Sequence, residues 1–495
     1  MPRLQHLIGG ALRSGESGRE GPVYDPALGV EVARVPLASA AEVDLAVSAA
    51  QSALPTWAAT SLARRSEILF SFRELLHRER ERIARVISRE HGKVHQDALG
   101  EVSRGLENVE FACGIPQLLK GGHSFQVSTG VDVYELRQPV GVVAGITPFN
   151  FPAMVPLWML ANAIACGNTF VLKPSEKDPS AGLLLGELFL EAGLPPGVLN
   201  VVHGDKEAVD ALLDHPQVAA ISFVGSTPIA RYVYQRGTTS GKRVQALGGA
   251  KNHMVVLPDA DVDMAADAAV SAAYGSAGER CMAISVVVAV GAVADPLVQA
   301  IRERLGGLRI GPAADPDSEM GPLVTGEHRD RVASYIDRGR EEGAEVVVDG
   351  RGREFAGEGF FLGASLLDRV RPEMQVYRDE IFGPVLAVVR AENYEEAVAV
   401  VNANPYGNGT AIFTRDGGTA RRYQQEVQVG LVGINVPIPV PVAYYSFGGW
   451  KASLFGDSHM YGPEGVHFYT RAKVVTSRWP DPASSQIDLG FPRTR

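Results

Sequence analysis

Apolar positions along the chain recur with the period of helices in the first third of the sequence. Ser39-Ala-Ala-Glu42 is a capping-box pattern, and apolar residues follow it at helical spacing. A second amphipathic helix is predicted between Leu62 and Leu76, and a third from about Lys93 to Cys113. We therefore expect the N-terminal third to be helical.

Between residues 140 and 247 the pattern changes to short apolar runs that alternate with helical stretches. The predicted strands are Val142–Ile146, Thr169–Leu172, Leu199–Val202, Ala219–Val224 and Val244–Leu247. The predicted helices lie near Pro152–Ala165, Ser180–Ala192, Lys206–Leu213 and Pro228–Gln235. This alternation indicates βαβ units with a parallel sheet, and such sheets bind nucleotides at the carboxyl ends of their strands.

A second alternating segment begins near Met254 and indicates another α/β domain. Its predicted strands are Met254–Leu257, Ile284–Val290, Glu345–Val348, Val385–Val389, Gly409–Phe413 and Gly433–Asn435. The proline-rich run Val436–Val442 is expected to be irregular, because proline cannot donate to a strand ladder. Val127–Leu136 and Phe468–Ser477 are rich in residues that favour strands.

Composition and charge narrow the class of protein. The 495 residues are 45% hydrophobic and 21% charged, as in an ordinary soluble globular protein, and the net charge of −10 argues against a broad nucleic-acid-binding face. The longest apolar stretch, Ala153–Cys166, is interrupted and too short to span a membrane. The N-terminus lacks the pattern of a signal peptide, and three cysteines fit a reducing compartment. We expect a cytoplasmic protein that binds neither nucleic acid nor membranes.

One of the three cysteines stands out as a candidate nucleophile. Cys113 and Cys166 lie in apolar runs, which is typical of buried thiols, whereas Cys281 lies in Gly278-Glu-Arg-Cys-Met-Ala283. An adjacent cation favours thiolate, so Arg280 is expected to lower the pKa of the Cys281 thiol. A thiolate adds readily to an aldehyde or acyl carbon.

Two motifs at predicted strand ends are suited to a dinucleotide. Gly225 and Ser226, in Phe223-Val-Gly-Ser-Thr227, could hold a pyrophosphate at a helix N-terminus, although the chain has no G-x-G-x-x-G and the motif alone could be a simple N-cap turn. Lys173 and Glu176 could bind the ribose hydroxyls of an adenosine, or form a solvated charged loop. A carboxylate at that position favours NAD over NADP.

Two further loops carry candidate chemistry. Asn150, between aromatic residues and prolines in Ile146–Pro152, could donate its amide to an oxyanion, or serve only the turn. Glu380-Ile-Phe382-Gly-Pro384 could hold a ribose and support a ring, or be an ordinary loop.

Taken in order, these motifs resemble the NAD(P)-dependent aldehyde dehydrogenase superfamily. The motifs are Pro148-Phe-Asn150, Lys173-Pro-Ser-Glu176, Phe223–Thr227, Leu247-Gly-Gly249 with the Cys281 loop, and Glu380–Pro384. A narrower resemblance is to the CoA-acylating branch of methylmalonate-semialdehyde dehydrogenases. It is carried by Gln245–His253, Gly278–Ala283, Val432–Pro441, Ser446–Gly449 and Phe468–Arg471.

The resemblance implies an α/β fold with a Rossmann-type NAD-binding domain, an α/β catalytic domain and a small β extension for oligomerisation. The implied boundaries are 1–123 with 140–248 for the first, 249–445 for the second, 124–139 with 446–480 for the extension, and a tail at 481–495. Because exposed edge strands pair with other strands, we expect a homodimer or homotetramer.

The resemblance also implies roles for individual residues. Cys281 is the nucleophile, and Asn150 with the Cys281 backbone N–H stabilises the oxyanion. The implied NAD-binding residues are Thr147, Phe149, Lys173, Glu176, Lys177, Gly225, Ser226, Gly248, Glu380 and Phe382. Arg104 and Arg280 are the implied ligands of a substrate carboxylate, although Arg104 alone could be a solvated helix charge. No metal site is predicted.

One departure from the superfamily points to the acyl acceptor. Hydrolytic members have a glutamate general base where this chain has Ala246, so CoA is expected to accept the acyl group. The expected reactions are oxidation of methylmalonate semialdehyde to propionyl-CoA, CO₂ and NADH, and of malonate semialdehyde to acetyl-CoA. A hydrolytic semialdehyde dehydrogenase that releases the free acid is the alternative, with Glu279 as the rival base.

Overall fold

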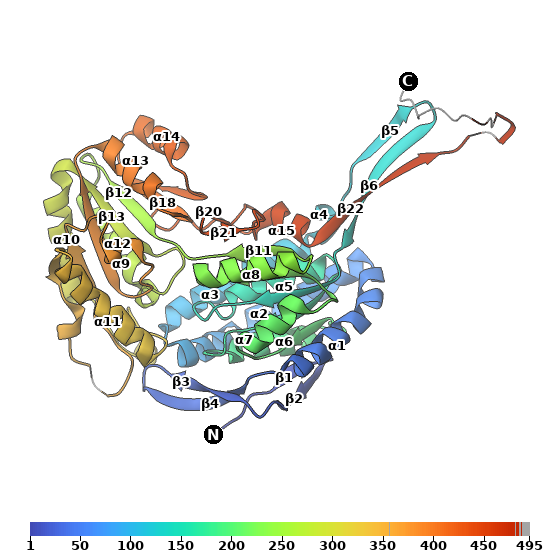
Figure 1. Cartoon of the computed structure of the whole chain (residues 1–495), viewed down its shortest axis with the longest axis horizontal. Helices are drawn as coiled ribbons and strands as arrows, with labels where there is room; N and C mark the ends of the chain where they lie inside the picture. Colours follow the sequence, from blue (N-terminus) through green and yellow to red (C-terminus); the bar gives the residue numbers. More distant parts are fainter. Residues whose placement is uncertain (356, 481, 485–486, 488–495) are drawn as a thin grey trace.

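In the computed structural model, two large sheets and a projecting three-stranded arm organise the chain (Figure 1). The structure describes residues 1–355, 357–480, 482–484 and 487. Apart from residues 482–484 and 487, the tail predicted at 481–495 lies outside the described residues.

The first sheet has the strand order β2-β1-β9-β8-β7-β10-β11-β21. Its strands are β1 (His6–Ile8), β2 (Ala11–Arg13), β7 (Val142–Ile146), β8 (Thr169–Lys173), β9 (Leu199–Val201), β10 (Val218–Val224), β11 (Arg243–Leu247) and β21 (Leu454–Phe455). The five strands from β9 to β11 run parallel, as the βαβ pattern predicts, and the edge strands pair antiparallel. The carboxyl ends of β7, β8, β10 and β11 therefore meet along one edge.

Helices cover both faces of the first sheet. They are α1 (Ala40–Ala59), α2 (Leu62–His91), α3 (His95–Cys113), α5 (Met154–Ala165), α6 (Ser180–Glu191), α7 (Lys206–Asp214) and α8 (Thr227–Thr239). Apolar side chains of α1, α7 and α8 pack on one face, and those of α2, α3, α5 and α6 pack on the other. The predicted capping box is confirmed, because Ser39 accepts from the Glu42 N–H while the Glu42 carboxylate accepts from the Ser39 N–H.

The prediction that the N-terminal third is helical is wrong for its first 36 residues. Residues 6–36 form four strands, β1 and β2 followed by the hairpin β3 (Glu20–Asp25) and β4 (Val30–Pro36). The prediction was wrong because the stabilising partner of β1 is distant in sequence: Leu7 pairs with Val201 of β9.

The second sheet has the strand order β14-β15-β16-β13-β12-β18-β19 and is parallel except at β14. Its strands are β12 (Asn252–Val256), β13 (Ile284–Val290), β14 (Glu345–Val348), β15 (Ser365–Asp368), β16 (Val385–Ala391), β18 (Gly409–Phe413) and β19 (Leu431–Ile434). Its helices are α9 (Val262–Tyr274), α10 (Ala294–Gly307), α11 (Gly326–Glu341), α12 (Gln375–Arg378), α13 (Tyr394–Ala403) and α14 (Gly417–Glu426). The predicted second α/β unit is confirmed, although β15 escaped prediction.

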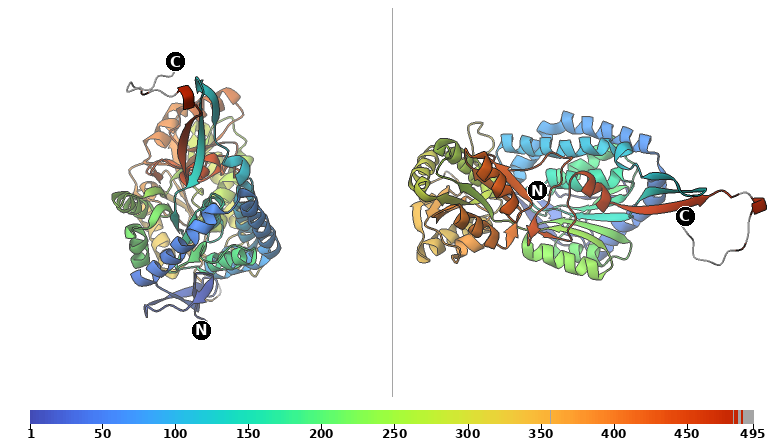
Figure 2. Two further views of the ribbon diagram at one scale, coloured as in Figure 1. Left: turned by 90° about the vertical axis from the view of Figure 1, so that its right-hand side faces the viewer. Right: turned by 90° about the horizontal axis from the view of Figure 1, so that it is seen from above.

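The arm is built from β5 (His123–Ser128), β6 (Val131–Pro139) and β22 (Thr470–Arg478), and it projects from the body of the molecule (Figures 1 and 2). The predicted single strand Val127–Leu136 is divided by a turn at Gly130, whose φ is +69°. Phe468, predicted to begin a strand, instead ends the short helix α15 (Gly462–Phe468). Leu454–Phe455, which the predicted extension included, pairs with the first sheet.

The remaining short elements are α4 (Ile115–Leu118), β17 (Tyr406–Gly407) and β20 (Trp450–Lys451). No helix among the described residues is both long enough and apolar enough to cross a membrane.

Candidate active site

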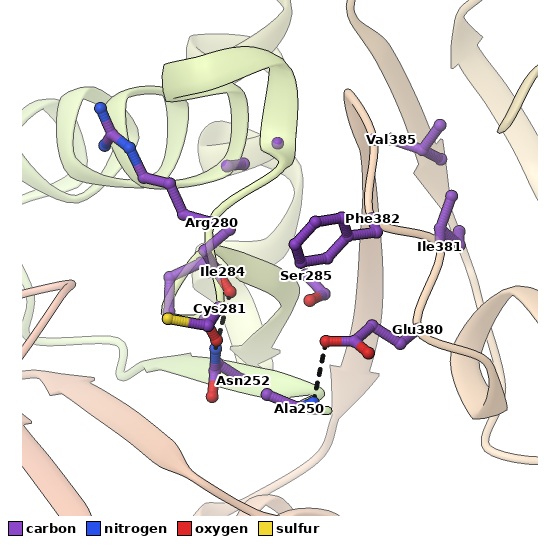
Figure 3. A pocket seen from close by; sticks show the side chains of 14 residues that line it. Ala250, Asn252, Arg280, Cys281, Ile284, Ser285, Glu380, Ile381, Phe382 and Val385 are labelled. Carbon is purple, nitrogen blue, oxygen red and sulfur yellow. Dashed lines mark hydrogen bonds between the residues drawn. The ribbon is translucent and has the colours of Figure 1, made fainter. Parts of the chain in front are cut away.

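A small cavity of about 20 Å³ lies where the Cys281 segment meets the loop Glu380–Pro384. Figure 3 shows Glu380 and Phe382 across this space from Cys281. The volume holds about one water molecule. Other lining residues are Ala250, Asn252, Ala273, Gly278, Arg280, Ala283, Ile284, Ser285, Ile381, Gly383 and Val385.

Cys281 lies in a segment that hydrogen bonds hold on the second sheet. Asn252 Nδ2 donates to the carbonyl oxygens of Cys281 and Ala283, both at 2.9 Å, and Asn408 Nδ2 donates to the Cys281 carbonyl oxygen at 3.2 Å. Asn252 begins β12, so the motif that contains it positions the nucleophile.

The predicted lowering of the Cys281 pKa is wrong. Burial is the main cause that raises the pKa of the thiol to about 12, and the nearby Glu380 carboxylate contributes to this increase. Arg280, the expected cation, donates from Nη2 to Asp97 Oδ1 at 2.7 Å, and its side chain points away from Cys281 (Figure 3). The thiol is therefore protonated in this state.

Glu380 shares the cavity with the thiol. Its Oε1 accepts the Ala250 N–H at 2.9 Å, and burial raises the pKa of the carboxyl to about 7. Phe382, two residues further along the loop, adopts a φ of +59°, a backbone conformation that side chains rarely favour. The loop therefore places a titratable carboxyl and an aromatic ring beside the nucleophile.

Asn150 points toward the nucleophile segment through a buried network. Its side-chain Nδ2 donates to the backbone carbonyl oxygen of Glu279 at 2.8 Å. The backbone carbonyl oxygen of Asn150 accepts from Lys93 Nζ at 2.7 Å. Lys93 also pairs with Glu101 at 2.7 Å, and Glu101 accepts the Ala153 N–H. Sequence reasoning missed the Lys93–Glu101 pair, because an isolated lysine and glutamate carry no motif.

The predicted nucleotide-binding residues lie along the shared edge of the first sheet. Ser226, the N-cap of α8, makes no capping hydrogen bond through its side chain, so its hydroxyl and the helix N–H groups are left for an anion. Lys173 Nζ lies 3.2 Å from Glu176 Oε2 at the end of β8. Thr147 Oγ1, after β7, is buried without a hydrogen-bond partner.

Two further residues complete this edge. A Cβ at Gly248 would lie 2.8 Å from the Ala452 carbonyl oxygen, so the close approach after β11 requires glycine. Gly225, after β10, donates its N–H to the Leu247 carbonyl oxygen at 3.1 Å. The unused hydroxyls and helix N–H groups of this edge fit a dinucleotide.

Phe149 and Lys177 connect the two halves of the site. Lys177 Nζ lies 4.6 Å from the Phe149 ring centroid, and that ring meets the Phe382 ring edge-on at 5.8 Å between centroids. This contact joins the loop after β7 to the loop that carries Glu380.

Arg104 and Arg280 have different environments. Arg104, on α3, is half-exposed, and its Nη1 lies 3.0 Å from Glu107 Oε2. Tyr461 is buried, which is the main cause of the raised pKa of its phenol, and Arg104 and Cys281 lie close enough to influence that pKa, so these three residues lie in one region. Sequence reasoning did not identify Tyr461, which carries no recognisable pattern.

The two positions considered for a general base lie outside the cavity lining. Ala246 is fully buried in the apolar layer with Ile146 and Phe223. The Glu279 side chain is fully buried and faces the Val324 N–H and two histidines, and burial raises its pKa to about 8. Among the carboxyl groups of the described residues, only that of Glu380 lines the cavity.

Fold and site define an α/β enzyme with a candidate cysteine nucleophile beside a predicted nucleotide-binding edge. The chain belongs to the aldehyde dehydrogenase family, whose sequence profile matches residues 12–475.

Its relatives are similar over their full length. A malonate-semialdehyde dehydrogenase of Pseudomonas aeruginosa is 58% identical over 99% of this chain and 100% of the relative. A methylmalonate-semialdehyde dehydrogenase of Oceanimonas doudoroffii has a solved structure with a TM-score of 0.96 and 54% identity, over 98% of this chain and 99% of that one. A Sinorhizobium meliloti protein assigned to the same enzyme class, solved with NAD, has a TM-score of 0.97 and 53% identity, over 98% and 99% of the two chains.

Proposed function

We propose that the protein oxidises malonate or methylmalonate semialdehyde with NAD and transfers the acyl product to CoA. The names of the full-length relatives support the substrate class. The observation that carries the chemistry is the cysteine–glutamate cavity beside a nucleotide-binding edge.

The residues present fit NAD. Lys173 and Glu176 would hold the adenosine ribose, Gly225, Ser226 and Gly248 would surround the pyrophosphate, and Glu380 would accept from the nicotinamide ribose. Thr147, Phe149, Lys177 and Phe382 would complete the site. When bound, NAD supplies the hydride acceptor.

Cys281 would carry the acyl group. Its sulfur adds to the aldehyde carbon, and the amide of Asn150 with the Cys281 N–H stabilises the resulting oxyanion. The thiol proton must leave first, because the pKa of the thiol is raised to about 12. Glu380, whose pKa is about 7 and which lines the same cavity, is the nearest candidate to receive that proton.

CoA is the acyl acceptor that best matches this site. Residue 246 is an alanine in an apolar layer, so it offers no carboxylate to activate water. A thiol needs less activation than water, and the CoA sulfur would displace the Cys281 sulfur from the thioester carbonyl. Hydrolysis to the free acid remains the competing outcome that an experiment must separate.

Arg104 is the better of the two arginines for a substrate carboxylate. Both arginines pair with a carboxylate, Arg104 with Glu107 and Arg280 with Asp97, but the Arg104 side chain is more exposed, at 42% against 24%. Arginine binds carboxylates through a bidentate fork. A carboxylate β to the new thioester can leave as CO₂ because the thioester carbonyl accepts the electron pair, which leads to acetyl-CoA or propionyl-CoA.

The proposal also covers the oligomeric state and the cellular location of the enzyme. The arm exposes Phe125 and Val474, so we propose that it pairs with other copies in a homodimer or homotetramer. Three free cysteines fit a cytoplasmic enzyme.

Stopped-flow measurement of NADH with malonate semialdehyde, with and without CoA, tests the proposal. We expect a single-turnover burst without CoA and steady turnover with CoA. Steady turnover without CoA would assign a hydrolytic enzyme, and absence of NADH in both cases would reject the substrate class.

A further inference from the structure

The first turns of α11 hold the loop that carries Glu380 and Phe382. Arg331 Nη2 donates to the Ile381 carbonyl oxygen at 3.1 Å, and His328 Nε2 donates to the Phe382 carbonyl oxygen at 2.7 Å. A Cβ at Gly383 would lie 2.5 Å from a methyl carbon of Val332, so the loop packs directly on the helix. Three consecutive loop residues are therefore fixed by one helix.

The loop needs such support because its backbone is strained. Phe382 has a φ of +59° without being glycine, and conformations of this kind persist only where the surroundings determine them. The hydrogen bond from His328 ends on the carbonyl oxygen of this same residue.

His328 also contacts the nucleophile segment. Its Nε2 lies 3.3 Å from Glu279 Oε1, two residues before Cys281. The same carboxylate oxygen accepts the Val324 N–H at 3.3 Å, just before α11 begins. One imidazole nitrogen thus lies between the two loops that form the cavity.

The partners of His328 assign its tautomer. Nε2 carries the proton, because it faces the Phe382 carbonyl oxygen and the Glu279 carboxyl, whereas Nδ1 accepts from Arg331 Nη2 at 3.2 Å. Burial and Arg331 lower the pKa of His328 to about 4, so the ring is neutral near pH 7. A ring that stays neutral and keeps one orientation can hold the loop in place. It is less suited to accepting and releasing protons.

We propose that His328 is a positioning residue that ties the Phe382 backbone to Glu279 and thereby holds the wall of the cavity opposite Cys281. His328 would influence the reaction through Phe382 and Glu380. This part of the proposal rests on the function proposed above.

Two amide variants separate positioning from packing. A glutamine amide reaches about where the imidazole Nε2 lies, and an asparagine amide reaches only about where Nδ1 lies. His328→Gln retains a donor for the Phe382 carbonyl oxygen, and His328→Asn loses it. His77→Gln, at an exposed position of α2, is the control.

Three readouts apply to each variant: the Kd of NAD by protein fluorescence, the rate of Cys281 alkylation by iodoacetamide without NAD, and KM for NAD against kcat. For His328→Asn we expect roughly a tenfold rise in Kd and KM for NAD, a smaller change in kcat, and faster alkylation as the wall loosens. His328→Gln should stay within about threefold of the wild type, because it restores one donor.

The proposal would be overturned if His328→Asn had the same Kd and KM for NAD and the same alkylation rate as the wild type. Equal losses in both variants, in proportion to a drop in melting temperature, would also overturn it, because His328 would then only fill space. If the wild type does not bind NAD, the proposed function fails, while the alkylation rates still test the tie between the two loops.

Discussion

The two sides of Cys281 are built in opposite ways. On the reactive side, defined as Cys281, Glu380 and the cavity between them, the two ionisable groups are half-buried and have few polar partners. Glu380 accepts one backbone N–H, and the pKa of the thiol is raised to about 12.

On the supporting side, defined as Lys93, Glu101, Glu279 and His328, the polar groups contact one another or the backbone, except that Glu279 Oε2 is buried without a hydrogen-bond partner. Lys93 pairs with Glu101 and also donates to Asn150, while the Glu279 carboxyl lies among Val324 and His328. Both Glu380 and Glu279 have a raised pKa, about 7 and about 8, and burial is the main cause in each. The comparison indicates that the reactive side is prepared for a ligand and the supporting side for stability.

The largest expected effect is on the reactive side. Cys281→Ala should lower kcat by about 10⁴-fold or more, because the nucleophile is lost, with little change in melting temperature. NADH formation under saturating substrate measures this effect. Cys113→Ser is the control, since Cys113 lies on α3 outside the cavity. Substantial activity in Cys281→Ala would show that Cys281 is not the nucleophile. The comparison between the reactive and supporting sides would then lose its basis.

On the supporting side, Lys93→Met should act on stability instead. It leaves the buried Glu101 carboxylate without its cation, which we expect to lower the free energy of unfolding by about 3–5 kcal/mol. Urea unfolding measures the change. Arg64→Met, which breaks an exposed pair with Glu67, should cost less than about 1 kcal/mol. Similar losses in the free energy of unfolding for Lys93→Met and Arg64→Met would contradict the assignment of Lys93 as a structural cation.

Arg104→Met tests recognition of the substrate on the reactive side. We expect about a 10- to 100-fold loss of kcat/KM for malonate semialdehyde, because a charge-assisted contact disappears. Propanal, which has no carboxylate, is the matched substrate and should be oxidised at an unchanged rate. An equal loss with both aldehydes would mean that Arg104 does not bind the carboxylate.

Glu380→Gln should weaken NAD binding about 10- to 150-fold if its carboxylate accepts from the ribose, because hydrogen bonds to charged groups contribute about 1.5–3 kcal/mol. Titration of protein fluorescence with NAD gives the Kd. Glu110→Gln, at an exposed position of α3, is the control. Unchanged affinity would exclude Glu380 from the NAD site.

The smallest effect is expected from Glu279→Gln and concerns pH. The folded protein keeps the Glu279 proton up to about pH 8, whereas the unfolded chain loses it near the ordinary value of 4.5. The folded state then binds more protons between these values, so this group makes stability fall as pH rises from about 4.5 to about 8. Glutamine removes that contribution, and melting temperatures across this range should decline less steeply. An unchanged slope would show that Glu279 is ionised in the fold.

Much of the fold could be predicted where local periodicity decides the element. β7, β13 and β18 have the bounds that their apolar runs predict, because each strand is buried on both faces and reads as a continuous hydrophobic run. The motifs also indicated Cys281 and Glu380 as candidates, and the structure brings both residues to one cavity. Among the N-terminal strands, β1 escaped because it pairs with the distant β9, whereas β3 and β4 form a local hairpin that the prediction of helix missed.

The residues around the nucleophile show what local sequence could not determine. Arg280 is adjacent to Cys281 in sequence, yet it pairs with Asp97, 183 residues away. The His328–Phe382 hydrogen bond and the Lys93–Asn150 hydrogen bond join segments 54 and 57 residues apart. No local pattern encodes such contacts.

By itself, the sequence determined most of the helices and strands after residue 38, the family resemblance and the choice of Cys281 as the candidate nucleophile. Only the tertiary structure decided the protonation of Cys281 and Glu380, the direction of Arg280, and the buried support from Lys93 and His328. The physical reason is that periodicity and turn chemistry are properties of neighbouring residues. Burial and the partners that offset it depend on which distant segments pack together.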